Sequence, residues 1–212
     1  MDIRLRRERE NETRSVEELT RDAFRNVYSP GCSEHYLLHR MRRSAAFIPE
    51  LNMVAERGGQ LVGHIAYART AIAIDAGGEC PVVTFGSVSV PPAFQRRGIG
   101  SALIEATKEM VQQMGFSAML ILGDPAYYQR FGLVPAEKYG LRNAEGRYAD
   151  ALQALELQPG ALAEAAGVFA RARPMPWMRA ILRRLSAAFK AMRQHRNGSW
   201  SSSSRDMTDM RR

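Results

Sequence analysis

The sequence predicts a mixed α/β fold (α+β) in which helices flank a buried sheet. One observation is a strand–helix–strand pattern between residues 81 and 122, where two apolar segments enclose a segment with helical periodicity. A second is a hairpin pattern, because the apolar segments 51–56 and 61–67 are joined by a turn that contains Gly58 and Gly59. Strands and helices that follow each other this closely along a chain bury the strands beneath the helices.

The composition indicates one globular domain with an appendage. Of the 212 residues, 45% are hydrophobic and 25% are charged, which is ordinary for a chain with a full core. The two cysteines, Cys32 and Cys80, lie in separate segments and argue against a disulfide framework and against zinc. No signal peptide is evident, and no segment approaches the ~20 apolar residues that span a membrane. We therefore expect a cytoplasmic protein.

The elements before the hairpin are an edge strand and a helix. Residues 3–6 form the expected edge strand. The periodicity of the next segment predicts a helix whose buried face contains Val16, Leu19, Ala23 and Phe24.

After the hairpin, residues 81–88 have the β-branched, apolar content of an interior strand. A long helix begins near Ile99 and ends at Gly115, a residue suited to a helix C-terminus. Its expected apolar face contains Ile99, Leu103, Ala106, Met110 and Met114. Residues 117–122 then form the next buried strand.

The turn between strand 81–88 and the long helix has the composition of a phosphate-binding loop. A helix start leaves backbone N–H groups unpaired and carries the positive end of the helix dipole. Glycines allow a phosphate to approach these groups, and arginines add counter-charge. We expect a pyrophosphate to bind the N–H groups of Arg96, Arg97, Gly98, Ile99, Gly100 and Ser101.

Two common phosphate motifs do not fit this turn. A P-loop requires a lysine after the glycines, and the dinucleotide fingerprint requires a third glycine where Leu103 stands. The sequence Gln95-Arg96-Arg97-Gly98-Ile99-Gly100 instead resembles the acetyl-CoA motif Gln/Arg-x-x-Gly-x-Gly/Ala of the GNAT superfamily of N-acetyltransferases. The resemblance covers residues 1 to about 172 and is closest to the predicted acetyltransferases of the YhbS type.

The resemblance implies a mostly antiparallel central sheet of about six to seven strands, flanked by helices and splayed between the fourth and fifth strands. It also implies acetyl-CoA as co-substrate, an amine as acceptor, and no metal. Backbone groups at Val88, Ser89 and Val90 would pair with the pantetheine arm, and Gln95 would belong to the cofactor loop. The N–H group near Val90 would donate to the carbonyl oxygen as negative charge develops there.

A second motif follows the strand at 117–122. Asp124 and Pro125 are typical of a helix start, and Gly132 of its end. In GNAT enzymes this segment carries an aromatic residue, a tyrosine, three residues and a glycine, so the general-acid tyrosine corresponds to Tyr128, and Tyr127 is expected to pack. A phenol with a pKa of ~10 stays protonated at neutral pH and can donate to the departing CoA thiolate.

The group that deprotonates the amine is not identified by the pattern. The cofactor strand offers Ser87 and Ser89, which are not competent bases without help. Glu50, His64, Asp124 and water remain as alternatives.

The net charge of +8 is concentrated at the C-terminal end. Residues 171–212 contain eleven Lys/Arg and two Asp, whereas residues 1–170 have a net charge of −1. Nucleic-acid binding by the catalytic domain is therefore not supported. The chain divides into a domain at 1–173, a basic amphipathic helix at 174–196 and a disordered tail at 197–212.

The apolar face of the basic helix needs a partner. The alternatives are its own domain, a second copy in a homodimer, or an anionic membrane surface contacted by residues 177–193. The expected function is direct acetyl transfer from acetyl-CoA to a primary amine of a small molecule or peptide, with the acceptor site formed by loops such as 29–44 and 142–148. The alternatives are a catalytically silent acyl-CoA sensor and a protein acetyltransferase recruited to membranes by the basic tail.

Overall fold

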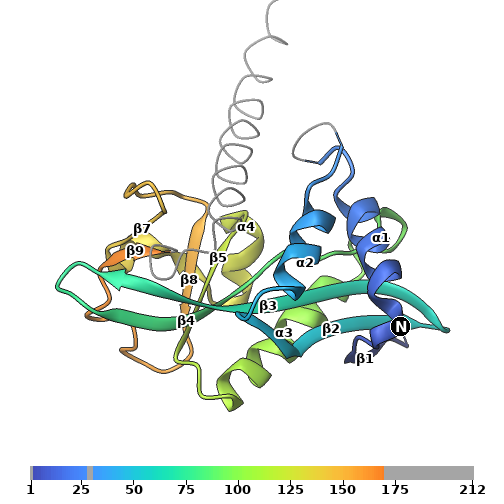
Figure 1. Cartoon of the computed structure of the whole chain (residues 1–212), viewed down its shortest axis with the longest axis horizontal. Coiled ribbons are helices and arrows are strands. Elements are labelled where there is room, and N and C mark those ends of the chain that lie inside the picture. Colours follow the sequence, from blue (N-terminus) through green and yellow to red (C-terminus); the bar gives the residue numbers. More distant parts are fainter. Residues whose placement is uncertain (1, 28–30, 170–212) are drawn as a thin grey trace, which may run out of the picture.

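The computed structural model describes residues 2–27 and 31–169. The basic helix expected at 174–196, the tail at 197–212 and the domain boundary at 173 lie outside the described residues. Within the described ranges, one sheet runs through the molecule with helices on both of its faces (Figure 1). No helix in these ranges is long and apolar enough to cross a bilayer.

The sheet has nine strands in the described part of the chain. They are β1 (Arg4–Arg7), β2 (Phe47–Arg57), β3 (Gln60–Ile74), β4 (Glu79–Phe85), β5 (Ala118–Leu122), β6 (Val134–Pro135), β7 (Leu141–Arg142), β8 (Leu152–Glu156) and β9 (Gly167–Phe169). The α-helices are α1 (Thr13–Phe24), α2 (Glu34–Arg42), α3 (Ile99–Gln113) and α4 (Pro125–Tyr128).

The main path of the sheet follows the order β1-β2-β3-β4-β5-β8-β6. Neighbours on this path are antiparallel except β4 and β5, which are parallel and paired at the single position Val83–Met119. The sheet is thus weakly joined between its fourth and fifth strands, and the predicted mixed, mostly antiparallel fold is confirmed. The short strands β7 and β9 extend the sheet beside the far end of β3.

Alternation along β3 separates two layers of core. Ile65 and Tyr67 pack in the cluster that contains α3, whereas Ala66 and Ala68 pack with residues of α1 and α2. Successive strand residues point to opposite faces, so α3 covers one face and the α1–α2 pair covers the other. His64 shares its parity with Ala66 and therefore faces the α1–α2 layer.

The contact of α3 with β3 is close enough to require a glycine. A Cβ atom at Gly63 would lie 2.7 Å from Ile99 Cγ2 and 3.0 Å from Leu103 Cδ1. One turn further along α3, the Tyr67 hydroxyl lies 2.8 Å from Thr107 Oγ1, which in turn donates to the Leu103 carbonyl. This contact sets the position of the first turn of α3.

The buried face of α3 differs from the one expected. Ile99 and Leu103 are buried as predicted, but the face continues through Ile104, Thr107 and Val111, and Met114 is exposed. The hydrogen bond with the Tyr67 hydroxyl satisfies the Thr107 hydroxyl in the core, so this polar residue can be buried. Hydrophobic periodicity alone does not predict such a hydrogen bond.

Several boundaries were also not foreseen. The segment 29–44, expected as a loop, contains α2, and β4 ends at Phe85 rather than at residue 88. Strands β6, β7 and β9 have only two or three residues each, too short to produce an alternating pattern. The edge strand, the hairpin with positive φ at Gly58 and Gly59, and β5 agree with the prediction.

We predict that Gly63→Ala lowers the free energy of unfolding by about 1–3 kcal/mol, because the added methyl overpacks the contact with α3. Gly86→Ala is the control, since its Cβ would meet only the flexible methyl end of Met41 at 3.0 Å. Urea denaturation of both variants measures the effect. Equal stability of Gly63→Ala and the parent would contradict the inferred close contact between β3 and α3.

Candidate active site

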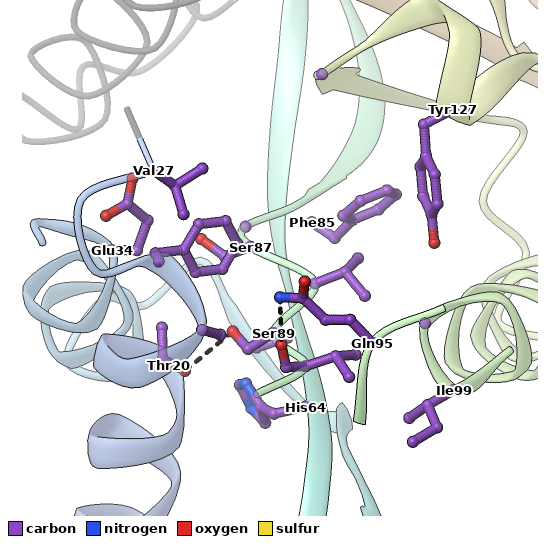
Figure 2. A pocket seen from close by; sticks show the side chains of 18 of the residues that line it. Thr20, Val27, Glu34, His64, Phe85, Ser87, Ser89, Gln95, Ile99 and Tyr127 are labelled. Atoms are coloured by element: carbon purple, nitrogen blue, oxygen red, sulfur yellow. Dashed lines mark hydrogen bonds between the residues drawn. The ribbon is translucent and has the colours of Figure 1, made fainter. Parts of the chain in front are cut away.

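A cavity of about 740 Å³ lies where β4 and β5 diverge. One side is lined by α1 and α2, the floor by β3 and the end of β4, and the other side by the loop before α3 and by α4 (Figure 2). Most of the residues proposed from the sequence therefore border one space.

A bulge at the end of β4 shapes the floor. The Gly86 N–H donates to the Ala66 carbonyl (3.0 Å), and Ser89 exchanges two backbone hydrogen bonds with His64 (2.8 and 2.9 Å). The paired positions His64 and Ala66 are two residues apart on β3, whereas Gly86 and Ser89 are three residues apart on the segment after β4. That segment therefore has one extra residue, as in a β-bulge. Because Ser89 pairs with β3, the backbone groups of Val88 and Val90 face the opposite edge, where no strand of the described residues pairs with them.

The loop from Arg96 to Ser101 presents a row of donors. None of the N–H groups of these six residues donates a hydrogen bond within the described part of the chain. Arg96 and Gly98 have positive φ values of 59° and 81°, so the loop turns sharply into the first turn of α3. Free donors, the helix dipole and the exposed guanidinium groups of Arg96 and Arg97 together favour an anion.

Gln95 has a structural part in this loop. Its side-chain amide donates to the Val90 carbonyl at 2.9 Å and ties the loop to the end of the bulged strand. Ser89 is likewise occupied, because its buried hydroxyl donates to Thr20 Oγ1 at 3.1 Å. These two residues hold the backbone in place and offer few groups to a ligand.

The two tyrosines of α4 lie on the far side of the cavity. Asp124 caps α4 by accepting from the Ala126 N–H at 3.0 Å, in agreement with the sequence-based interpretation. The Tyr128 ring packs over Gly123, where a Cβ would lie 2.0 Å from Tyr128 Cε2, and its centroid is 5.8 Å from that of Phe85. Tyr127 points toward the start of α3 (Figure 2), with its hydroxyl 2.9 Å from the position of a Cβ on Gly100.

His64 belongs to a buried ionic network below the floor. Its Nε2 lies 2.8 Å from Asn52 Oδ1 and 3.4 Å from Glu8 Oε2, while its buried Nδ1 has no hydrogen-bond partner among the described residues. Glu8 is bound in turn by Arg42 at 2.5 and 2.6 Å. Burial lowers the pKa of His64 below its ordinary value of 6.5, and the nearby carboxylate of Glu8 only partly opposes this.

The pKa of the Glu8 carboxyl is also lowered. Burial by itself would raise this pKa, but the hydrogen bonds and charges of His64 and Arg42 outweigh the desolvation. The network therefore favours a neutral imidazole beside an ionised carboxylate at neutral pH.

The structure separates the three candidate bases. Glu50 is exposed on β2 and does not line the cavity, and Asp124 is engaged as a helix cap. His64 lines the cavity, although its side chain is only 1% exposed.

Among the lining residues that sequence reasoning did not single out, two are charged. Arg130, within the second motif, lies over the Tyr127 ring at 4.8 Å and donates to its carbonyl at 2.9 Å. Glu34 comes from α2, a helix within the segment 29–44 that was expected as a loop at the acceptor site. Conversely, the loop at 142–148, expected near the acceptor, contributes nothing to the lining. Across residues 2–27 and 31–169, no group of three or more His, Cys, Asp or Glu is arranged to hold a metal ion.

The burial of neutral His64 predicts a pH dependence of stability. The unfolded chain binds a proton near pH 6.5 and the folded chain only at lower pH, so stability is full above 6.5 and falls as the pH drops toward the folded pKa. Each unit of pKa depression contributes about 1.4 kcal/mol. Because the pKa of Glu8 is lowered in the folded chain, this residue adds a further loss of stability only below its ordinary pKa of 4.5.

Urea denaturation between pH 7.5 and 5 tests this prediction. His64→Gln should flatten the slope, whatever its effect on baseline stability. His39→Gln is the control, because His39 is 42% exposed and pairs with Glu17 at the surface. A slope unchanged in His64→Gln would show that another group takes up the proton.

Comparison with known proteins places this geometry in a family. The profile of the acetyltransferase (GNAT) domain matches residues 4–136. The uncharacterized N-acetyltransferase YhbS of Escherichia coli K12 is 27% identical over 111 residues, which cover 52% of this chain and 64% of that protein. The matched segment thus spans just under two thirds of that relative.

Two solved structures are similar. A GNAT family acetyltransferase from Brucella melitensis in complex with acetyl-CoA is 30% identical, with a TM-score of 0.60 over 74% of this chain and 90% of that one. Escherichia coli YhbS in complex with CoA is 24% identical and shares the fold, with a TM-score of 0.69 over 79% of this chain and 88% of that one. Since the domain profile covers more than half of the sequence, the chain belongs to the GNAT acetyltransferase family.

Proposed function

We propose that this protein transfers the acetyl group of acetyl-CoA directly to a primary amine. The observation that carries the proposal is the row of six N–H groups from Arg96 to Ser101, unbonded within the described residues, beside an unpaired strand edge. The similar proteins from Brucella melitensis and Escherichia coli contain acetyl-CoA or CoA in their structures.

In this proposal the pyrophosphate binds the loop before α3, and Arg96 and Arg97 supply counter-charge. The pantetheine arm lies along the edge formed by Val88 and Val90, as an added strand would. The N–H of Val90 then donates to the thioester oxygen while the tetrahedral centre forms. The weak joining of β4 to β5 supports this placement, because it leaves the edge open.

The chemistry is a direct transfer. The amine nitrogen attacks the thioester carbon, the C–S bond breaks, and the thiolate leaves. None of the described residues that line the cavity is a cysteine, which favours direct attack over an acyl-enzyme. Tyr128 serves as the general acid and delivers a proton to the departing sulfur.

The amine must also lose a proton. Of the candidate bases, His64 and Asp124 border the cavity, but Asp124 is engaged as a helix cap. The neutral state of His64 and its Nδ1, which has no partner among the described residues, suit a proton acceptor. Because the imidazole is buried, we expect the proton to reach it through water rather than by direct contact with the amine.

The proposed cofactor site leads to a first prediction about function. Gly98→Glu should abolish acetyl-CoA binding, since it adds strain at a positive φ and places a negative charge where phosphate binds. Gly98→Ala is the matched control, because it adds the strain without the charge and should retain weakened binding. Isothermal calorimetry with acetyl-CoA measures both. If Gly98→Glu bound acetyl-CoA as tightly as the parent, the pyrophosphate would not bind at this loop.

The proposed role of Tyr128 as general acid leads to a second prediction about function. Tyr128→Phe should lower kcat by about 10²-fold with little change in acetyl-CoA affinity, because only the proton donor is lost. Tyr127→Phe should have a smaller effect. Steady-state kinetics against a panel of primary amines, combined with calorimetry, tests both variants.

The same panel of amines distinguishes an acetyltransferase from a catalytically silent acyl-CoA sensor. A parent protein that binds acetyl-CoA yet turns over no amine or peptide would be a silent acyl-CoA module. An unchanged rate in Tyr128→Phe would exclude this residue as the acid. Membrane recruitment and dimer formation depend on residues outside the described ranges and stay predictions.

A further inference from the structure

The part of the cavity formed by α1 and α2 is apolar. We call it the acceptor chamber, and its walls are Ala23, Phe24, Val27, Leu37, Leu38 and Met41. Val27 of this chamber and Tyr127 lie on opposite sides of the cavity (Figure 2). A chamber of this kind accommodates an alkyl or aromatic segment of a ligand.

One carboxylate interrupts this apolar lining. Glu34, the first residue of α2, is 4% exposed and lines the cavity beside Val27 (Figure 2). Its Oε2 accepts hydrogen bonds from the Ser33 N–H at 2.9 Å and from the Cys32 thiol at 3.2 Å. Its Oε1 has no partner among the described residues, and no Arg, Lys or His of these residues pairs with the carboxylate.

Glu8, which follows β1 and is bound by Arg42 of α2, is a contrasting case. The Glu8 side chain is 2% exposed, but Arg42 binds both of its oxygens. A buried carboxylate is costly unless a cation compensates it. The fold supplies that cation for Glu8, whereas for Glu34 the described residues provide only two hydrogen bonds and the start of a helix dipole. The missing positive charge is a feature that a ligand can provide.

We infer that Glu34 binds a second cationic group of the acceptor, so that the substrate is an amine with an apolar spacer and a further ammonium or guanidinium. This inference rests on the proposed transferase function. The amine that reacts lies near Val90 and Tyr128, which line the same cavity as Glu34. Glu34 and Tyr127, the neighbour of Tyr128 on α4, lie on opposite sides of this cavity (Figure 2). The spacer occupies the acceptor chamber, and the second cation ends at the carboxylate. Glu34 is thus a specificity-determining residue and takes no part in proton transfer.

Acetylation kinetics of the full chain test this inference. The probes are diaminoalkanes from 1,4-diaminobutane to 1,8-diaminooctane, each paired with the monoamine of equal carbon number. We expect kcat/KM for the best diamine to exceed that of its monoamine by about tenfold or more, the size of one charge-assisted hydrogen bond. Glu34→Gln should remove this advantage, mainly by raising KM for the diamine, and leave the monoamine unchanged.

Two controls keep the result interpretable. Glu18→Gln removes the same charge from an exposed position on α1, where Glu18 pairs with Arg14 at 3.2 Å, and should preserve the diamine preference. Monoamine turnover and acetyl-CoA affinity in Glu34→Gln report whether that variant folds. Glutamine retains an oxygen that can accept from Ser33 and Cys32.

The outcomes distinguish the inference from the proposed function. Equal kcat/KM for diamines and monoamines, or a diamine preference that survives Glu34→Gln, would overturn the inference while the transferase assignment stands. Failure of both kinds of amine to react or to bind the CoA complex in calorimetry would overturn it as well. Failure of the parent to bind acetyl-CoA would instead refute the proposed function.

Discussion

The pairing of Ser89 with His64 beyond a bulge is the interaction on which the site depends. Two backbone hydrogen bonds hold the chain against β3 after β4 has ended at Phe85. The next strand in the sheet, β5, pairs with β4 at one position only, so the chain from residue 86 onward has a free edge among the described strands. Without this pairing, the segment could close on β5 and fill the space that now forms the cavity.

The same pairing sets the approach to α3. The Gln95 side chain binds the Val90 carbonyl, and Gly63 on β3 allows Ile99 to approach within contact. The N–H row from Arg96 to Ser101 is therefore anchored at both ends by β3, once through the bulged segment and once through the helix. Preorganised donors of this kind bind an anion without further ordering of the backbone.

Charge is distributed unevenly around the cavity. On the side of α3 and α4, Arg96 and Arg130 border the space together with Asp124, whose carboxylate caps α4, whereas Glu34 contributes a carboxylate on the side of α1 and α2. Glu8 and Arg42 neutralise each other below the floor. In the proposed function, the two arginines lie on the side of the CoA phosphates and Glu34 lies on the side of the acceptor.

The sequence by itself determined the local features of this protein. The hairpin turn at Gly58 and Gly59, the loop at Gly98 and the cap at Asp124 each depend on conformational preferences within a few residues, and such preferences are visible in a linear pattern. The tertiary structure alone decided which face of α3 is buried, that α2 forms, and that Glu34 borders the cavity without a cation among the described residues while Glu8 receives Arg42. These outcomes depend on contacts between residues that are distant in the sequence, and no pattern along the chain encodes such distances.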